Sequence, residues 1–104
     1  LAVPRASELA YGAVGAMLAG VYTVADQSLF DDLVRLHDSE GIRIEPSAAA
    51  GFSGPRQVYL SAAGQTYLAE RGLLAHMPQS THLVWTTGGL FVPDQEYAQF
   101  LRHR

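Results

Sequence analysis

The chain has 104 residues, of which 48% are hydrophobic and 16% charged, and its net charge is −3. This composition excludes a disordered chain and a nucleic-acid-binding protein, because the charged fraction is low and the arginines stand singly, without a basic stripe. The absence of cysteine excludes disulfides and thiolate metal sites. Since the chain starts at Leu1 and not at a methionine, we expect a piece of something larger or a processed product. The apolar stretch 9–24 is shorter than the roughly 20 residues of a membrane span, so we expect no membrane contact.

The N-terminal part of the chain predicts two helices with a short strand between them. Ser7 is a good N-cap, and the alanine- and glycine-rich residues after it predict a helix to about Gly20. Residues 21–24 alternate like a short strand. Asp26 is expected to cap a second helix, which Gly41 ends. The apolar face of this helix holds Leu29, Phe30, Leu33, Val34 and His37, and its solvated face holds Asp31, Asp32, Arg35 and Asp38.

The middle of the chain predicts a strand followed by two helices. Residues 42–44 form the short strand, and Pro46 opens a mostly buried helix through the alanines that follow, because proline suits the first helical position. Residues 52–57 have the composition of a loop. Ser61 is expected to cap a further helix that ends at Gly72.

The last part of the chain holds the best strand signal, an apolar and β-branched run over residues 82–87. Pro93 opens a final helix. Strands that alternate with helices predict an α/β fold, in which a mainly parallel sheet is covered by helices on both faces. So few short strands make a poor independent sheet, and we therefore expect residues 1–104 to be one segment of a larger domain.

The first candidate for chemistry is Thr87, which is followed directly by Gly88 and Gly89. Ligands of open α/β sheets bind outside the carboxyl ends of the strands, and glycines let a backbone approach a flat ligand closely. A threonine hydroxyl can donate a hydrogen bond to a ring nitrogen or accept one. The alternative is a strand that ends in an ordinary turn with a local threonine cap, and on the tripeptide alone this alternative is favoured.

The second candidate is the turn of Glu45, Pro46 and Ser47, which also follows a predicted strand and leads into a helix. One interpretation is that the Glu45 carboxylate lies at the helix N-terminus because the helix dipole stabilises a negative charge there. The other is that Glu45 is partly buried and has a shifted pKa. Because both candidate turns lie at strand ends of one predicted sheet, we expect them to share a crevice.

The histidines give no comparable signal. His82 lies in the predicted strand, where a lone histidine is more often a hydrogen-bonded core residue than a catalyst. His37 is expected on a helix, at the surface or half-buried, and His76 and His103 in a loop and at the tail. No pair has metal-ligand spacing, and the sequence contains no phosphate-binding loop, nucleophile elbow or dinucleotide fingerprint.

These motifs together resemble a known family. Residues 1–8 look like the Asp-Gly-Leu-Ala-Val segment of pyridoxal-phosphate enzymes of fold type II, and residues 24–48 look like that family's helix, strand and Glu-Pro-Ser turn. The run 82–89 (His-Leu-Val-Trp-Thr-Thr-Gly-Gly), with Val92 and Pro93, closely resembles the C-terminus of the D-serine dehydratases (D-serine ammonia-lyases). The resemblance covers nearly the whole chain.

The resemblance implies a cofactor and a reaction. In this family a serine or threonine at the position of Thr87 bonds the pyridine nitrogen of pyridoxal 5′-phosphate, so Thr87 and Gly88 are expected at the cofactor. Glu45 and Ser47 match the family motif and are expected near the cofactor ring. A neutral alcohol, unlike a carboxylate, cannot hold a proton on that nitrogen, which makes the ring a weaker electron sink. β-Elimination tolerates this because the β-hydroxyl leaves with the electrons, and D-serine would give pyruvate and ammonia.

The chain contains no lysine, so it cannot supply the family's Schiff-base lysine. That lysine, the phosphate-binding glycine loop and the monovalent-cation site are expected in the rest of the same enzyme chain, and the fragment alone is predicted to be inactive. A cytoplasmic location fits such an enzyme. Two alternatives stay open: another fold type II lyase or racemase, such as threonine dehydratase, L-serine dehydratase or serine racemase, and a non-catalytic ligand-binding module.

Overall fold

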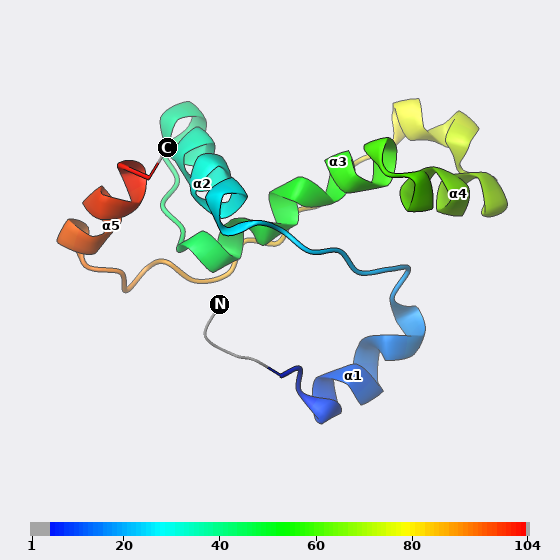
Figure 1. Cartoon of the computed structure of the whole chain (residues 1–104), viewed down its shortest axis with the longest axis horizontal. Coiled ribbons are helices and arrows are strands. Elements are labelled where there is room, and N and C mark those ends of the chain that lie inside the picture. Colours follow the sequence, from blue (N-terminus) through cyan, green and yellow to red (C-terminus); the bar gives the residue numbers. More distant parts are fainter. Residues whose placement is uncertain (1–4, 104) are drawn as a thin grey trace.

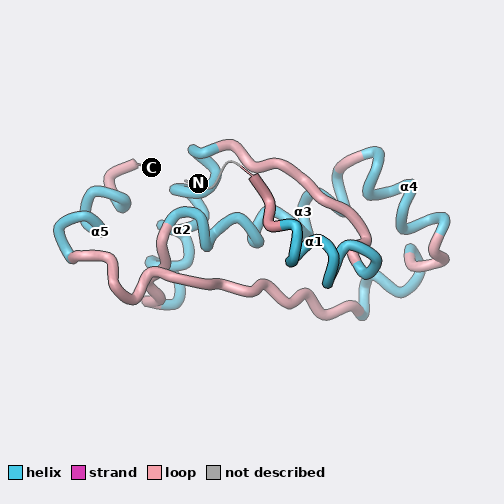
Figure 2. Tube along the Cα trace, turned by 90° about the horizontal axis from the view of Figure 1, so that it is seen from below, coloured by secondary structure: helices cyan, strands magenta, loops and turns pink. Residues whose placement is uncertain are grey.

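The computed structural model describes residues 5–103, so the part of the expected similarity that falls on residues 1–4 lies outside the described residues. Within this range helices are the only regular secondary structure, as Figures 1 and 2 show. The α-helices are α1 (Glu8–Val14), α2 (Asp26–Glu40), α3 (Ser53–Leu60), α4 (Ala62–Glu70) and α5 (Asp94–Leu101). Three 3₁₀ segments accompany them: η1 (Gly15–Met17), η2 (Pro46–Phe52) and η3 (Leu74–Gln79).

The predicted α/β fold with a parallel sheet is therefore wrong for the described residues. The expected strands 21–24, 42–44 and 82–87 lie between helices, and no backbone hydrogen bond within residues 5–103 joins any two of them. An alternating or apolar run indicates that a segment can pair as a strand, but a strand exists only where a neighbour supplies the ladder of hydrogen bonds. The described chain provides no such neighbour for these segments.

The helix ends were predicted better than the strands. Ser7 caps α1 by accepting a hydrogen bond from the Ala10 amide (3.3 Å), and Ser61 caps α4 through the Gly64 amide (2.9 Å). Gly41 ends α2 in the left-handed region (φ 68°), where glycine has no steric penalty. Asp26 is not the cap of α2 but its first residue, since the N-cap position belongs to the preceding alanine.

Three segments differ from the prediction. The first helical run, α1 with η1, ends at Met17 and not near Gly20. The predicted loop 52–57 is mostly helical, because α3 begins at Ser53 and accommodates Pro55 in its first turn, where the missing amide has no intrahelical partner to lose. The segment η3 was not predicted at all.

The hydrophobic core lies where α2, η2 and α5 meet. Leu33 of α2 and Ala49 of η2 are fully buried, and Tyr97 of α5 is 4% exposed. The small side chains of η2 let it pack closely against α2. Asp32 was expected on the solvated face of α2 but is only 6% exposed, and Arg56 of the unpredicted helix α3 lies 3.8 Å from its carboxylate.

The molecule is extended for its size. Its radius of gyration is 15.7 Å, against about 13 Å for a compact domain of this length. Its accessible surface is 8067 Å², against roughly 5,700 Å² for a compact protein of this mass. In Figure 1 α1 stands apart from the other helices, and none of its residues is buried. No helix within residues 5–103 is long and apolar enough to cross a membrane.

Candidate functional site

The two turns singled out in the sequence lie against each other. Gly88 has φ 80°, and a Cβ built on it would lie 2.5 Å from Glu45 Oε1. Gly89 has φ 115°, and a Cβ built on it would lie 2.6 Å from the Ile44 Cα. The positive φ favours glycine at both positions. At Gly89 the overlap with backbone atoms is a second reason, whereas at Gly88 the neighbouring atoms belong to the end of the flexible Glu45 side chain. The structure thus places Gly88 and Gly89 against residues 44 and 45, although no sheet within residues 5–103 holds them.

Glu45 is held in place from its own turn. The Ser47 hydroxyl donates a hydrogen bond to Glu45 Oε1 (3.2 Å), and both residues are half-buried. Ile44, directly before Glu45, is 3% exposed and anchors the turn in the core. Pro46 begins η2, where a residue without an amide hydrogen costs no helical hydrogen bond. The carboxylate of Glu45 is thus presented at a fixed place beside Gly88.

Thr87 stands at the exposed edge of this pair of turns. Its side chain is solvent-exposed, and its hydroxyl makes no hydrogen bond to any residue in the range 5–103. An exposed hydroxyl that precedes two glycines without side chains can take the polar edge of a flat ligand. The site lacks an amine nucleophile, because the chain contains no lysine.

Sequence reasoning missed a cluster around Arg43, two residues before Glu45. Arg43 Nη1 donates to Asp94 Oδ1 (2.8 Å), and its guanidinium carbon lies 4.4 Å from the centroid of the Tyr97 ring. Burial raises the pKa of the Tyr97 phenol above its ordinary value, and the Asp38 carboxylate raises it as well, while the Arg43 charge lowers it. No spacing rule connects Arg43 to residues half the chain away, so only the fold could reveal the cluster.

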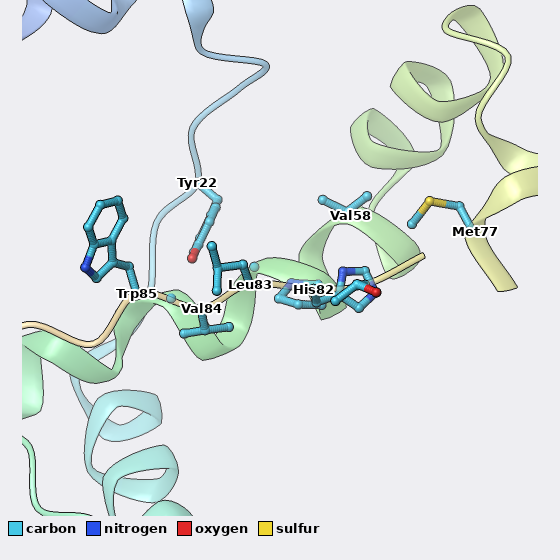
Figure 3. Close-up of a pocket in the computed structure, with 11 residues that line it drawn as sticks. Tyr22, Val58, Met77, His82, Leu83, Val84 and Trp85 are labelled. Atoms are coloured by element: carbon cyan, nitrogen blue, oxygen red, sulfur yellow. The ribbon is translucent and has the colours of Figure 1, made fainter. Parts of the chain in front are cut away.

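A groove runs beside residues 81–85, which lead to Thr87 (Figure 3). On one side of it the Tyr22 hydroxyl donates to the Ala50 carbonyl (2.9 Å). Gly51 lies so close to Val84 that a Cβ on it would come within 2.9 Å of the Val84 side chain. Much of the groove is apolar or aromatic, with lining residues that include Tyr22, Val58, Met77, Leu83, Val84 and Trp85.

The histidines lie outside the paired turns. His82 was expected in a core but is exposed, with its ring edge-on to Tyr59 at 5.9 Å. His37 is half-buried as expected and contacts Asp38 (3.1 Å), while His103 stacks on Phe30 at 4.6 Å. Among residues 5–103 no three histidine or acidic side chains gather closely enough to hold a metal ion.

Comparison with known proteins confirms the resemblance to the D-serine dehydratases. No protein-family model matches the chain. The chain is 57% identical over 100 residues to a probable D-serine dehydratase of Paracidovorax citrulli, a match that covers 96% of this chain and 22% of that protein. A probable D-serine dehydratase of an Acidovorax species is 54% identical over 100 residues, again with 96% and 22% covered. One of Sinorhizobium medicae is 46% identical over 101 residues, with 97% and 23% covered. The chain thus spans less than a quarter of the length of these relatives.

Proposed function

We propose that the chain is part of a pyridoxal-phosphate-dependent D-serine ammonia-lyase and supplies the part of the active site that holds the cofactor's pyridine ring. The identity of 57% to a protein with the printed name of probable D-serine dehydratase supports the reaction class. The observation that carries the placement is the Thr87 hydroxyl, which has no hydrogen-bond partner among residues 5–103 and directly precedes Gly88, the residue that lies against Glu45.

The residues present fit one end of this cofactor. A pyridine nitrogen needs a single hydrogen-bonding group at the ring edge, and the exposed Thr87 hydroxyl has no other partner in the described chain. Gly88 and Gly89 have no side chains to stand between that hydroxyl and a flat ring. The carbonyl and phosphate ends of the cofactor need a lysine and a phosphate cradle, and the 104 residues contain no lysine. Those groups would come from polypeptide outside these residues.

Bound pyridoxal phosphate supplies an electron sink for the elimination of water from D-serine, which leads to pyruvate and ammonia. Thr87 would hold the ring nitrogen by donating a hydrogen bond from its hydroxyl, which keeps its proton, so that nitrogen would stay unprotonated. Ser47 donates to Glu45 and thereby fixes the carboxylate beside Gly88. The Glu45 carboxylate is thus held next to Gly88, the residue that follows Thr87.

The test uses the full-length protein that contains this segment. Its absorbance is recorded with and without added pyridoxal phosphate, and pyruvate release is measured with D-serine and with L-serine. A visible absorption band together with pyruvate from the D-isomer supports the proposal. Pyruvate from the L-isomer alone, or a racemised product, would assign the chain to a related lyase or racemase. If the protein is colourless and takes up no cofactor, the proposal is wrong, and the remaining interpretation is a non-catalytic ligand-binding module. The cytoplasmic location stays a prediction.

A further inference from the structure

We propose that Arg43 is a positioning residue for the candidate cofactor site: it ties the Glu45 turn to α5 and thereby holds the Gly88–Gly89 turn, with Thr87, in place. This inference rests on the proposed function for its consequence in cofactor binding. The claim that Arg43 holds these two turns in place concerns only residues of this chain and rests on their contacts alone.

Arg43 makes two contacts with α5 at once. Its Nη1 donates to Asp94 Oδ1 (2.8 Å) in the first turn of the helix, and its guanidinium lies over the Tyr97 ring at 4.4 Å. Tyr97 is 4% exposed and packs in the core, so the ring is a fixed surface, although Asp94 itself is exposed. A planar guanidinium can stack on a ring and donate to a carboxylate in the same pose, which a lysine ammonium cannot do.

Two contacts hold the ends of one segment of the chain: Ile44 with Gly89, and Arg43 with Asp94. We call this pair of contacts the clamp. Gly89 lies against the Ile44 backbone, and α5 begins only five residues later, at Asp94. The intervening loop is closed by a hydrogen bond from the Val92 amide to the Gly89 carbonyl (3.3 Å). Adjacent residues 43 and 44 therefore hold both ends of the segment 89–94, one through Gly89 and the other through Asp94. If the Arg43 contact is lost, Tyr97 still holds α5 in the core, but the first turn of α5 at Asp94 is no longer tied to residue 43, and the segment 89–94 is then held less firmly at that end.

The position of Thr87 depends on the same clamp. Thr87 precedes the glycine pair directly, and its side chain has no hydrogen bond of its own among residues 5–103. Its place relative to Glu45 is thus set by the backbone contacts of Gly88 and Gly89. Arg43 reaches Thr87 only through those glycines, so its removal is expected to loosen the hydroxyl without removing any group from the candidate site.

The experiment compares variants of the full-length protein. Arg43→Met removes the charge and keeps most of the stem, and Arg43→Lys keeps the charge without the planar group. Arg71→Met is the matched control, because Arg71 also lies over a tyrosine ring (Tyr67, 5.7 Å) but in the α4 region, away from the glycine pair. Two quantities are measured: amide hydrogen exchange of the peptide that covers residues 86–92, and the dissociation constant of pyridoxal phosphate.

We expect Arg43→Met to speed exchange over residues 86–92 and to raise the cofactor dissociation constant by roughly three- to tenfold, from the usual strength of such a stacked cation. Arg43→Lys should fall between Arg43→Met and the wild type, and Arg71→Met should leave both quantities unchanged. Asp94→Asn, at an exposed carboxylate, removes the ion pair without touching the core and should speed exchange over 86–92 to a smaller degree. It keeps the test decisive if Arg43→Met does not fold.

Unchanged exchange over residues 86–92 in Arg43→Met, or in Asp94→Asn where Arg43→Met does not fold, would overturn the proposal. An equal increase in Arg71→Met would overturn it too, since the effect would then be general. If the wild-type protein binds no pyridoxal phosphate, the proposed function fails, and the exchange data still decide whether the clamp exists. Faster exchange with an unchanged cofactor dissociation constant would show that the clamp holds the turn but does not position the cofactor group, which rejects the positioning role.

Discussion

Gly89 lies on the backbone of Ile44 so closely that a Cβ at position 89 would come within 2.6 Å of the Ile44 Cα. Two stretches that are 45 residues apart in the sequence thus meet backbone to backbone. Because Ile44 is 3% exposed and belongs to the core, it cannot move aside without disturbing the packing of α2 and α5. The contact of Gly89 with Ile44 therefore fixes the position of the residues directly before Gly89, including Thr87.

Gly89→Ala is expected to destabilise the full-length protein by roughly 3 kcal/mol, since it combines a strained positive φ with an overlap against backbone. Gly41→Ala is the matched control, because Gly41 also has a positive φ (68°) but meets open space. It should cost about 1 kcal/mol. The free energy of unfolding in urea gives both values, and equal costs for the two variants would show that the close approach of residues 44 and 89 does not hold.

Tyr97 predicts a pH dependence of stability. Burial raises the pKa of its phenol above the ordinary 10.0, so the folded state keeps a proton that the unfolded chain has already released. The stabilisation is therefore complete below pH 10 and is lost as the pH rises from 10 through the folded-state pKa. Tyr97→Phe should remove this part of the alkaline loss and change stability at neutral pH by less than about 1 kcal/mol, since the hydroxyl oxygen has no hydrogen-bond partner within residues 5–103. Thermal midpoints from pH 7 to 11 check this, and parallel curves for the two proteins would contradict it.

Asp32 is expected to matter more than its neighbour Asp31. Asp32 is 6% exposed and lies 3.1 Å from Arg35 and 3.8 Å from Arg56, so it links α2 to α3. Asp32→Ala should cost roughly 1–2 kcal/mol, and Asp31→Ala less than about 0.5 kcal/mol, because within residues 5–103 Asp31 accepts a hydrogen bond only from the exposed Gln27. Urea unfolding of both variants measures the difference. A larger cost for Asp31→Ala would mean that Asp32 has no such linking role.

Trp85 tests whether other polypeptide covers the exposed apolar residues. In this chain Trp85 is 83% exposed and Leu83 is 90% exposed, as are Leu90 and Phe91 beyond the glycines, at 87% and 93%. Surfaces of this kind are normally buried against a partner, and the relatives are more than four times as long as this chain. We propose that the rest of the same polypeptide covers them.

The fluorescence of Trp85, taken as the difference between the full-length protein and its Trp85→Phe variant, should be blue-shifted and poorly quenched by acrylamide. The same result at dilutions where the protein is monomeric would distinguish this occupant from a second copy. A red-shifted, readily quenched component would show that the surface is exposed in the full-length protein as well.

The sequence analysis was reliable where local chemistry decides the structure. Ser61 and Gly41 marked helix ends because a side-chain cap and a left-handed glycine act within a few residues. It failed for residues 82–87, because a strand depends on a distant partner that composition does not show. The meeting of Glu45 and Gly88 was predicted from the ends of parallel strands in a sheet, and residues 5–103 form no sheet. The two turns do lie against each other as predicted, but they are joined by the close approach of Gly88 and Gly89 to residues 44–45 and not by a sheet.

The measurement that tests the central claim most directly is the dissociation constant of pyridoxal phosphate from the full-length protein and from Thr87→Val. Valine has the shape of threonine without its hydroxyl, and Thr86→Val is the matched control at the neighbouring exposed threonine. The account predicts that Thr87→Val weakens cofactor binding by roughly tenfold or more and shifts the absorption maximum of the bound cofactor, while Thr86→Val does neither. Thr87→Ser should restore both. Equal binding by wild type and Thr87→Val would contradict the assignment of Thr87 to the cofactor ring.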